Sequence, residues 1–478
     1  MNLLPLPRSV QNRPGTFRLT GRTPVIASPD LQPLAASLAR ALSSGPDPLP
    51  LGTGSPDLPA VRLELNPEIT EAEGYRLEVE PGGILLQACA PAGLFWALQT
   101  LLQLLPVRPL LPVTIDCVRI QDAPRHAWRG LMLDVARHFF PLEDIKRLID
   151  LAALYKFNVL HLHLTDDQGW RLEIRSWPKL AEVGGSTATH GDPGGYYTQA
   201  QYRELVAYAA GRCMTVIPEI DLPSHTQAAI AACPELGGIS KHAGLYTGTE
   251  VGFSTLDVHK EITYRFIQDV LGELAALTPG PYLHIGGDEA HSTPDTDYIP
   301  FIERVQEIVR KLGKQPLGWE EIGKARLLPE TVVQYWWNET VTRQAAAQGN
   351  RLVISPARHA YLDIKYDAAT RLGQDWTRSY VEVRDSYAWD PLSVLPGLPP
   401  GQILGVEAPL WTETIVSRDD MDAMFFPRLC AIAEVGWTDA GRREWQDFRR
   451  RLSAHGPRLT SLGVRYHPSA QIDWQNEA

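Results

Sequence analysis

The feature that most constrains the fold of this chain is an alternation that begins near Arg125 and continues toward the C-terminus. Short apolar runs alternate with segments whose apolar residues recur every three or four positions, and these patterns predict strands and amphipathic helices. The runs that predict strands are Gly130–Asp134, Val159–Leu164, Thr215–Ile220, Tyr282–Gly286, Pro316–Trp319, Thr331–Trp336, Arg351–Ile354 and Ile403–Ala408. Eight strands with intervening helices favour a closed (β/α)₈ TIM barrel, an α/β fold, over an open sheet.

Residues 1–124 differ in texture and predict a small α+β domain in front of the barrel. Short alternating runs such as Tyr75–Val79 predict strands, Gly83–Cys89 predicts another strand, and Gly93–Leu105 predicts an apolar helix. We therefore expect two domains: an α+β domain over residues 1–124, and a catalytic barrel with a C-terminal helical tail over residues 125–478.

Composition and charge exclude several classes of partner. The 45 Lys and Arg residues against 56 Asp and Glu residues give a net charge of −11, which would repel a phosphate backbone, so no nucleic acid partner is expected. No apolar run approaches the roughly 20 residues that span a bilayer, and the N-terminal residues lack the apolar stretch of a signal peptide. We expect a cytoplasmic protein with no membrane partner. The five scattered cysteines form no C-x-x-C pair and are expected to be core thiols.

Polar and aromatic residues gather just after the predicted strands, which is where a TIM barrel builds its active site. Carboxylates and indoles dominate there, whereas glycine-rich phosphate loops and a G-x-S-x-G motif are missing, which argues against phosphoryl transfer and serine hydrolysis. Carboxylates beside aromatic planes suit a neutral polyhydroxylated ligand such as a sugar, whose apolar C–H faces stack on indoles and whose hydroxyls donate to carboxylates.

The pair Asp288-Glu289 is the strongest candidate for catalysis. It follows the sequence HIGG, in which two glycines let the backbone approach a ligand closely. Among the tryptophans, only Trp319, Trp336 and Trp411 stand at strand ends and so favour a role in a site.

A metal-dependent barrel hydrolase is the main alternative. His161 and His163 are spaced by two on a predicted strand, so both imidazoles lie on one face, and with His225, His284 and Asp288 they could form a metal site. Against this, both histidines lie within the strand rather than at its end, where a hydrogen-bonded core residue is the more common role.

The chain resembles glycoside hydrolase family 20, the β-N-acetylhexosaminidases. The resemblance follows the barrel in order and is carried by these segments: WRGLMLDVARHFF (128–140), HLHLTDDQGWRLEI (161–174), VIPEIDLPSHT (216–226), HIGGDEAH (284–291), LGWEEI (317–322), QYWW (334–337), YLD (361–363) and GVEAPLWTET (405–414). Residues 1–124 resemble the small α+β domain that commonly precedes the barrel in this family.

The resemblance implies an exo-acting, retaining β-N-acetylhexosaminidase that removes terminal GlcNAc or GalNAc. In this family the 2-acetamido oxygen of the substrate attacks C1 and forms an oxazolinium intermediate, so no enzymic nucleophile is needed. Glu289 matches the general acid/base, whose pKa we expect to be raised by the adjacent Asp288. Asp288 would accept the acetamido N–H and stabilise developing positive charge.

The resemblance also assigns the remaining positions. Arg137 and Glu413 would hold sugar hydroxyls, while Tyr361 and Asp363 would contact the acetamido group. The walls of the acetamido pocket would be Trp319, Trp336 and Trp411. Asp166, His225 and Glu219 would form a linked carboxylate–imidazole–carboxylate support behind the site.

No metal or organic cofactor is expected, and the partner is an oligosaccharide or glycoconjugate with a terminal β-linked N-acetylhexosamine. The sequence leaves the oligomeric state open. A second alternative is a carbohydrate-binding barrel without turnover, against which the intact Asp288-Glu289 pair argues.

Overall fold

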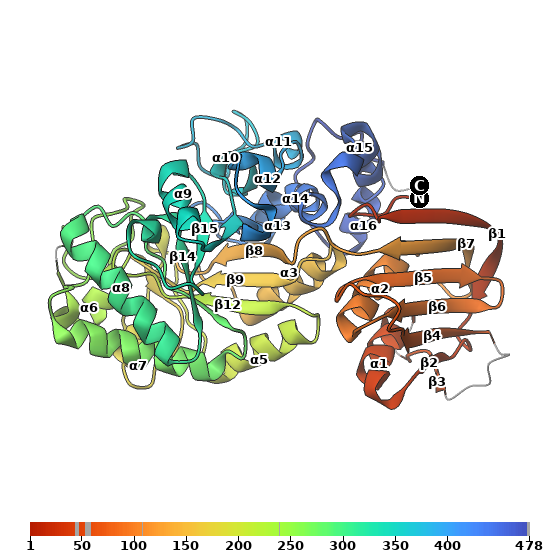
Figure 1. Cartoon of the computed structure of the whole chain (residues 1–478), viewed down its shortest axis with the longest axis horizontal. Coiled ribbons are helices and arrows are strands. Elements are labelled where there is room, and N and C mark those ends of the chain that lie inside the picture. The colour runs from red at the N-terminus through yellow and green to blue at the C-terminus, as the bar shows by residue number, and fades with distance from the viewer. Residues whose placement is uncertain (44–46, 53–58, 108, 239, 476–478) are drawn as a thin grey trace. The chain divides into compact units, whose positions relative to one another are not determined.

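The computed structural model describes residues 1–43, 47–52, 59–107, 109–238 and 240–475 (Figure 1). The chain forms two compact units, one comprising Met1–His126, Ala152–Lys156 and Ala433–Ala478, and the other comprising Ala127–Leu151 and Phe157–Ile432. The segment 433–478, which the sequence analysis placed in the barrel domain as a tail, thus groups with the N-terminal residues. The predicted domain limits at residues 124 and 125 stay a prediction.

The first unit is built on a seven-stranded sheet with the order β1-β7-β5-β6-β4-β2-β3. Its helices α1 (Gln32–Ala41) and α2 (Pro91–Gln103) bury apolar side chains, and α15 (Trp445–Ser453) and α16 (Gly456–Ser461) belong to the same unit. The strands are β1 (Ser9–Leu19), β2 (Val25–Ala27), β3 (Leu51–Gly52), β4 (Ala60–Leu65), β5 (Tyr75–Glu80), β6 (Gly83–Ala88) and β7 (Val113–Asp122).

The second unit contains a closed barrel of eight parallel strands in the order β8-β9-β12-β13-β14-β15-β16-β17, which closes by pairing β17 with β8. The strands are β8 (Trp128–Asp134), β9 (Val159–His163), β12 (Thr215–Glu219), β13 (Tyr282–His284), β14 (Gln315–Trp319), β15 (Val332–Tyr335), β16 (Arg351–Ile354) and β17 (Ile403–Leu410). Each coincides with a predicted strand to within two residues at either end, and the TIM-barrel prediction is confirmed.

Helices of the expected amphipathic pattern connect the strands. In α7 the apolar positions Phe266, Ile267, Val270 and Leu274 are all buried, as the three-and-four spacing requires. The main connecting helices are α3 (Leu142–Leu154), α5 (Gln199–Ala210), α7 (Glu261–Leu277), α8 (Asp295–Lys311) and α9 (Glu339–Ala347), and α13 (Arg418–Phe425) and α14 (Arg428–Trp437) follow the last strand. No helix in the described part of the chain has both the length and the apolar character needed to cross a membrane.

The barrel interior has an apolar cluster and a polar cluster. The apolar cluster is formed by Trp128, Val159, Ile217, Leu317, Val332 and Val353. The polar cluster centres on Glu407, which accepts hydrogen bonds from Trp128 Nε1 (3.0 Å), His161 Nδ1 (2.8 Å) and Gln334 Nε2 (2.9 Å). Buried charge is tolerated only where it is hydrogen-bonded or paired, and this cluster meets that condition.

Candidate active site

A pocket of about 320 Å³ lies among the loops that follow the barrel strands. That is the end of the barrel where TIM-barrel enzymes place their catalytic residues. Nine of the predicted site residues line it: Arg137, Asp288, Glu289, Trp319, Trp336, Tyr361, Asp363, Trp411 and Glu413. The other three, Asp166, Glu219 and His225, are buried; His225 contacts Asp166, and Glu219 accepts a hydrogen bond from Trp319 Nε1 at 2.8 Å.

The loop after β13 brings Asp288 and Glu289 into the pocket through an unusual backbone path. Gly286, Gly287 and Glu289 all have positive φ values, of 65°, 104° and 45°. A Cβ atom at Gly286 would lie 1.7 Å from Asp221 Oδ1, so only glycine fits there. Glu289 carries a Cβ atom, so its positive φ strains the backbone locally. Such strain is found at functional sites.

His225 lies beside both carboxylates. Its Nε2 is 3.4 Å from Glu289 Oε2 and 3.7 Å from Asp288 Oδ2, and its Nδ1 is 3.2 Å from Asp166 Oδ1. Burial opposes a charge on the imidazole, but the negative charge and hydrogen bond of Asp166 outweigh it and raise the pKa of His225 well above its ordinary value. A protonated His225 therefore faces the candidate catalytic pair.

The two carboxylates of the pair have different proton affinities. Burial raises the pKa of Asp288 to about 6, although the charge of His225 opposes the shift. Burial also acts on Glu289, but the hydrogen bond and charge of His225 prevail and lower the pKa of Glu289. The expectation that Asp288 raises the pKa of Glu289 is therefore wrong, because the imidazolium of His225 is the stronger neighbour.

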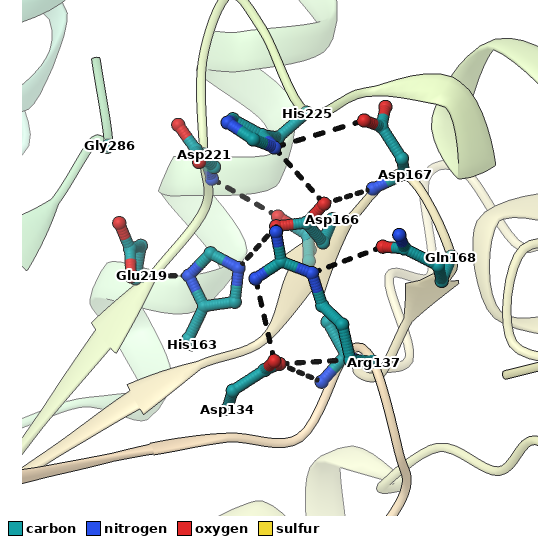
Figure 2. A network of polar contacts seen from close by, with 12 residues as sticks. Asp134, Arg137, His163, Asp166, Asp167, Gln168, Glu219, Asp221, His225 and Gly286 are labelled. Atoms are coloured by element: carbon teal, nitrogen blue, oxygen red, sulfur yellow. Dashed lines mark hydrogen bonds and ion pairs between the residues drawn. The ribbon is translucent and has the colours of Figure 1, made fainter. Parts of the chain in front are cut away.

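The support behind the pair differs from the expected arrangement of Asp166, His225 and Glu219. Glu219 does not contact His225 directly. His163 lies between the two carboxylates instead, with Nδ1 2.6 Å from Glu219 Oε2 and Nε2 2.8 Å from Asp166 Oδ2, as Figure 2 shows. His163 therefore joins Asp166 to Glu219, whereas His225 lies between Asp166 and Glu289.

Arg137 is held by three partners from the loops around it (Figure 2). Its Nη2 is 2.9 Å from Asp166 Oδ2, its Nη1 donates to Asp134 Oδ2 at 3.4 Å, and its Nε donates to Gln168 Oε1 at 3.1 Å. A guanidinium has five N–H donors, so this fixed side chain keeps donors for a ligand while it lines the pocket.

Aromatic rings form much of the pocket wall. Trp319 and Trp411 lie 5.7 Å apart between ring centroids, and the guanidinium of Arg137 lies 5.0 Å from the Trp411 ring centroid. Trp336 stacks on Tyr361 at 6.2 Å with an interplanar angle of 19°. Flat apolar surfaces of this kind match the C–H faces of a pyranose ring.

Several buried carboxylate oxygens in the pocket have no hydrogen-bond partner among the described residues. They are Asp288 Oδ1, Glu413 Oε2 and both side-chain oxygens of Asp363. Burial raises the pKa values of Asp363 and Glu413, and the charge of Glu413 raises that of Asp363 further. Unpartnered buried acceptors are costly, so these atoms are available for the hydroxyl or N–H donors of a ligand.

The histidines proposed as metal ligands take part in this carboxylate network. Among the described residues, groups such as His161, Glu219 and His284 are close enough to hold an ion. Adjacent carboxylates, however, raise the pKa of His161 to about 9 and that of His163 well above its ordinary value, in both cases against the effect of burial. A protonated imidazole has no lone pair for a metal, so these contacts favour hydrogen bonding at His161 and His163, whereas burial lowers the pKa of His284.

Sequence reasoning did not select four further pocket residues: Thr249, Val251, Gln374 and Trp376. They lie in loops without periodicity, where only the aromatic character of Trp376 was a signal. It also passed over Glu320, which accepts backbone N–H bonds from Trp336 (2.7 Å) and Trp337 (3.0 Å) and so fixes the loop after β15. The two carboxylates after β14, Glu320 and Glu321, were a visible signal for this role.

Two family models match the chain. "Glycosyl hydrolase family 20, domain 2" matches residues 1–123, and "Glycosyl hydrolase family 20, catalytic domain" matches residues 126–297 and 291–440. The chain is 42% identical to a beta-N-acetylhexosaminidase of Cellulomonas fimi over 99% of its own length and 97% of the relative's length.

Solved structures give the same result. A family 20 beta-N-acetylhexosaminidase from Streptomyces coelicolor superposes with a TM-score of 0.93 at 45% identity, over 99% of both chains. A mutant beta-hexosaminidase of Streptomyces plicatus in complex with product (GlcNAc) has the same TM-score and identity, over 99% of this chain and 98% of that one.

A parallel barrel with carboxylates and indoles at its strand ends defines a carbohydrate-active enzyme, and the comparisons supply the family. The chain belongs to glycoside hydrolase family 20. The predicted family, the predicted enzyme class, a β-N-acetylhexosaminidase, and the predicted fold are thereby confirmed.

Proposed function

We propose that this enzyme is an exo-acting, retaining hydrolase of terminal β-linked N-acetylhexosamine in oligosaccharides or glycoconjugates, and that it uses the acetamido group of the substrate as the nucleophile. One observation carries the proposal. A pocket with aromatic walls holds the Asp288-Glu289 pair together with buried carboxylate oxygens that lack partners. Its volume of about 320 Å³ is near the lower end of the about 300–1,000 Å³ typical of ligand pockets, which suits one terminal sugar.

Asp288 is proposed to orient the acetamido group. Its unpartnered Oδ1 is a ready acceptor for the acetamido N–H, and the ionised carboxylate stabilises the positive charge that develops on the oxazolinium ring. Trp319, Trp336 and Trp411 exclude water from this region, which strengthens the electrostatic interaction.

Glu289 is proposed to protonate the leaving oxygen and then to activate water. His225 lowers the pKa of Glu289, so the proton must reach Glu289 as the substrate binds. A neutral sugar that displaces water disfavours the charged carboxylate and raises its pKa. The contact of 3.4 Å between His225 Nε2 and Glu289 Oε2 offers a path for that proton.

The remaining pocket residues are proposed to recognise the sugar. Arg137 and Glu413 hold the ring hydroxyls, because a fixed guanidinium and a buried carboxylate supply complementary donors and acceptors. Tyr361 donates to the acetamido oxygen, and Asp363 lies beside it in the same pocket. Asp166, Glu219 and His225 support the pair from behind.

The proposal is tested with two chromogenic substrates, an N-acetyl-β-glucosaminide and the matching β-glucoside, which lacks the acetamido group. We expect hydrolysis of the first only. Glu289→Gln should lower kcat on the N-acetyl-β-glucosaminide by at least about 100-fold, whereas the control Glu307→Gln on the surface of α8 should leave it unchanged. Cleavage of both substrates at similar rates would refute acetamido participation.

A further inference from the structure

A second hollow, of about 440 Å³, lies beside the sugar pocket. Its lining consists of Trp337, Arg358, Trp376, Thr377, Arg378 and Ser379. Trp376 lines both cavities, so the hollow continues from the sugar pocket. Its residues come from the loops after β15 and β16, on the side of the barrel where the predicted site lies.

The hollow has an exposed aromatic surface. Trp337 and Trp376 are each 43% exposed, although a tryptophan side chain is normally largely buried. Their ring centroids lie 5.4 Å apart with an interplanar angle of 58°, and Trp376 also contacts Trp336 and Tyr361 of the sugar pocket at 5.9 and 6.1 Å. The aromatic wall of the sugar pocket thus continues outward into the hollow.

Two arginine side chains, Arg358 and Arg378, line the hollow together with these rings. Arg358 lies over the Trp337 ring with Cζ 5.1 Å from the centroid, an arrangement that leaves the N–H donors at the guanidinium edge free. Arg358 and Arg378 are both exposed, and neither side chain has a hydrogen bond or ion pair with any described residue.

The acidic groups near the hollow have their own partners. Glu339 accepts from Arg343 at 2.8 Å, and Asp375 lies 3.9 Å from Lys365 Nζ. Neither arginine forms an ion pair with an acidic side chain of the described residues, although the protein has a net charge of −11. They place positive charge next to a sugar pocket whose charged side chains are mainly acidic.

We propose that this hollow binds an acidic sugar on the leaving-group side of the scissile bond, with its ring against Trp337 and Trp376 and its carboxylate on Arg358 and Arg378. This inference rests on the proposed function, and the place given to the leaving group follows from Trp376, which lines both the sugar pocket and the hollow. An uncharged sugar would use the aromatic surface alone and leave both guanidiniums without a ligand. Guanidinium donors match carboxylate geometry in a bidentate manner, which gives the site its preference.

The test compares two disaccharides that differ in one group: N-acetyl-β-glucosaminyl-(1→4)-glucuronate and the same compound with its carboxylate reduced to a hydroxymethyl group. We expect kcat/KM to be about five- to tenfold higher for the acid in 20 mM salt, and the preference to shrink in 500 mM salt as screening increases. The 6-sulfate of the reduced disaccharide is the third substrate. A preference for the glucuronate over the sulfate supports a carboxylate site, and the reverse order would overturn it.

Variants identify the residues responsible. The double variant Arg358→Gln/Arg378→Gln should bring the ratio of kcat/KM for acidic over neutral disaccharide to about one, and each single variant should lower it in part. Arg203→Gln, on the exposed face of α5, makes the same change in charge elsewhere and should keep the full ratio.

Three results distinguish the ways in which these proposals can fail. If the unmodified enzyme cleaves both disaccharides equally, the acidic site is refuted and the proposed function stands. If it cleaves neither these disaccharides nor the chromogenic N-acetyl-β-glucosaminide, the proposed function itself fails. An acid preference that survives the double variant would place the recognition of charge elsewhere and overturn the assignment to Arg358 and Arg378.

Discussion

Replacing Asp288 with asparagine should stabilise the fold while removing activity, because the ionised carboxylate is held at an energetic cost. Asp288 is only 8% exposed, and burial raises its pKa from 3.8 to about 6. The folded state therefore binds this proton more tightly than the unfolded state does. The free energy of unfolding falls as pH rises from about 4 to about 6, and the full destabilisation by the ionised Asp288 is present above that range.

The size of the effect follows from the two pKa values. A shift from 3.8 to about 6 corresponds to about 3 kcal/mol at pH 7.5 and about 1 kcal/mol at pH 4.5. Asparagine is uncharged at both values, so the stabilisation by Asp288→Asn should be about 2 kcal/mol larger at pH 7.5 than at pH 4.5. Any constant difference between an amide and a protonated carboxyl cancels in this comparison.

Thermal unfolding of the unmodified enzyme and the variant at the two pH values measures the difference. For a unit of this size, 2 kcal/mol corresponds to a change in Tm of about 3–5 °C. The exposed Asp419→Asn on α13 is the matched control for the change from aspartate to asparagine outside the pocket. A stabilisation by Asp288→Asn that is equal at both pH values, or larger at pH 4.5, would refute the reasoning.

Two further expectations concern the same pocket. Asp288 must be ionised to stabilise positive charge. We therefore expect kcat/KM on the chromogenic N-acetyl-β-glucosaminide to fall about tenfold per pH unit below about pH 6. A pH–rate profile that is flat from pH 4.5 to 7 would contradict this. Glu320→Gln replaces the carboxylate that accepts the Trp336 and Trp337 backbone N–H groups. We expect the free energy of unfolding to fall by about 1–3 kcal/mol and KM to rise, whereas the control Glu339→Gln on the surface should change neither. Unchanged stability and KM in Glu320→Gln would disprove the positioning role of Glu320.

The barrel could be predicted from the sequence because each strand lies in or overlaps an apolar run of four to six residues, and helices of regular period separate these runs. The same periodicity located the pocket, since polar residues at successive strand ends must meet at one end of a barrel. Trp319 and Trp411 illustrate this: Trp319 ends β14, Trp411 directly follows β17, and their rings lie 5.7 Å apart.

The electrostatics of the site could not be predicted in the same way. The pKa of Glu289 depends on which charged group approaches it most closely, and the adjacent Asp288 suggested a raised value. His225, 64 positions earlier in the sequence, lies 3.4 Å away and reverses the direction. The role of His163 was missed for a similar reason, because a strand pattern does not show that an imidazole in the barrel joins two carboxylates.

These contacts form one continuous series from the barrel interior to the candidate acid/base. The series alternates carboxylates and imidazoles in the order Glu407, His161, Glu219, His163, Asp166, His225 and Glu289, with contacts of 2.8, 3.0, 2.6, 2.8, 3.2 and 3.4 Å. Each buried carboxylate stabilises the imidazolium beside it, so the charge on His225 depends on residues that never touch a substrate. A change in the protonation of Glu289 must therefore be accommodated along the series, which explains why an enzyme for a neutral sugar keeps so many ionisable groups in its barrel.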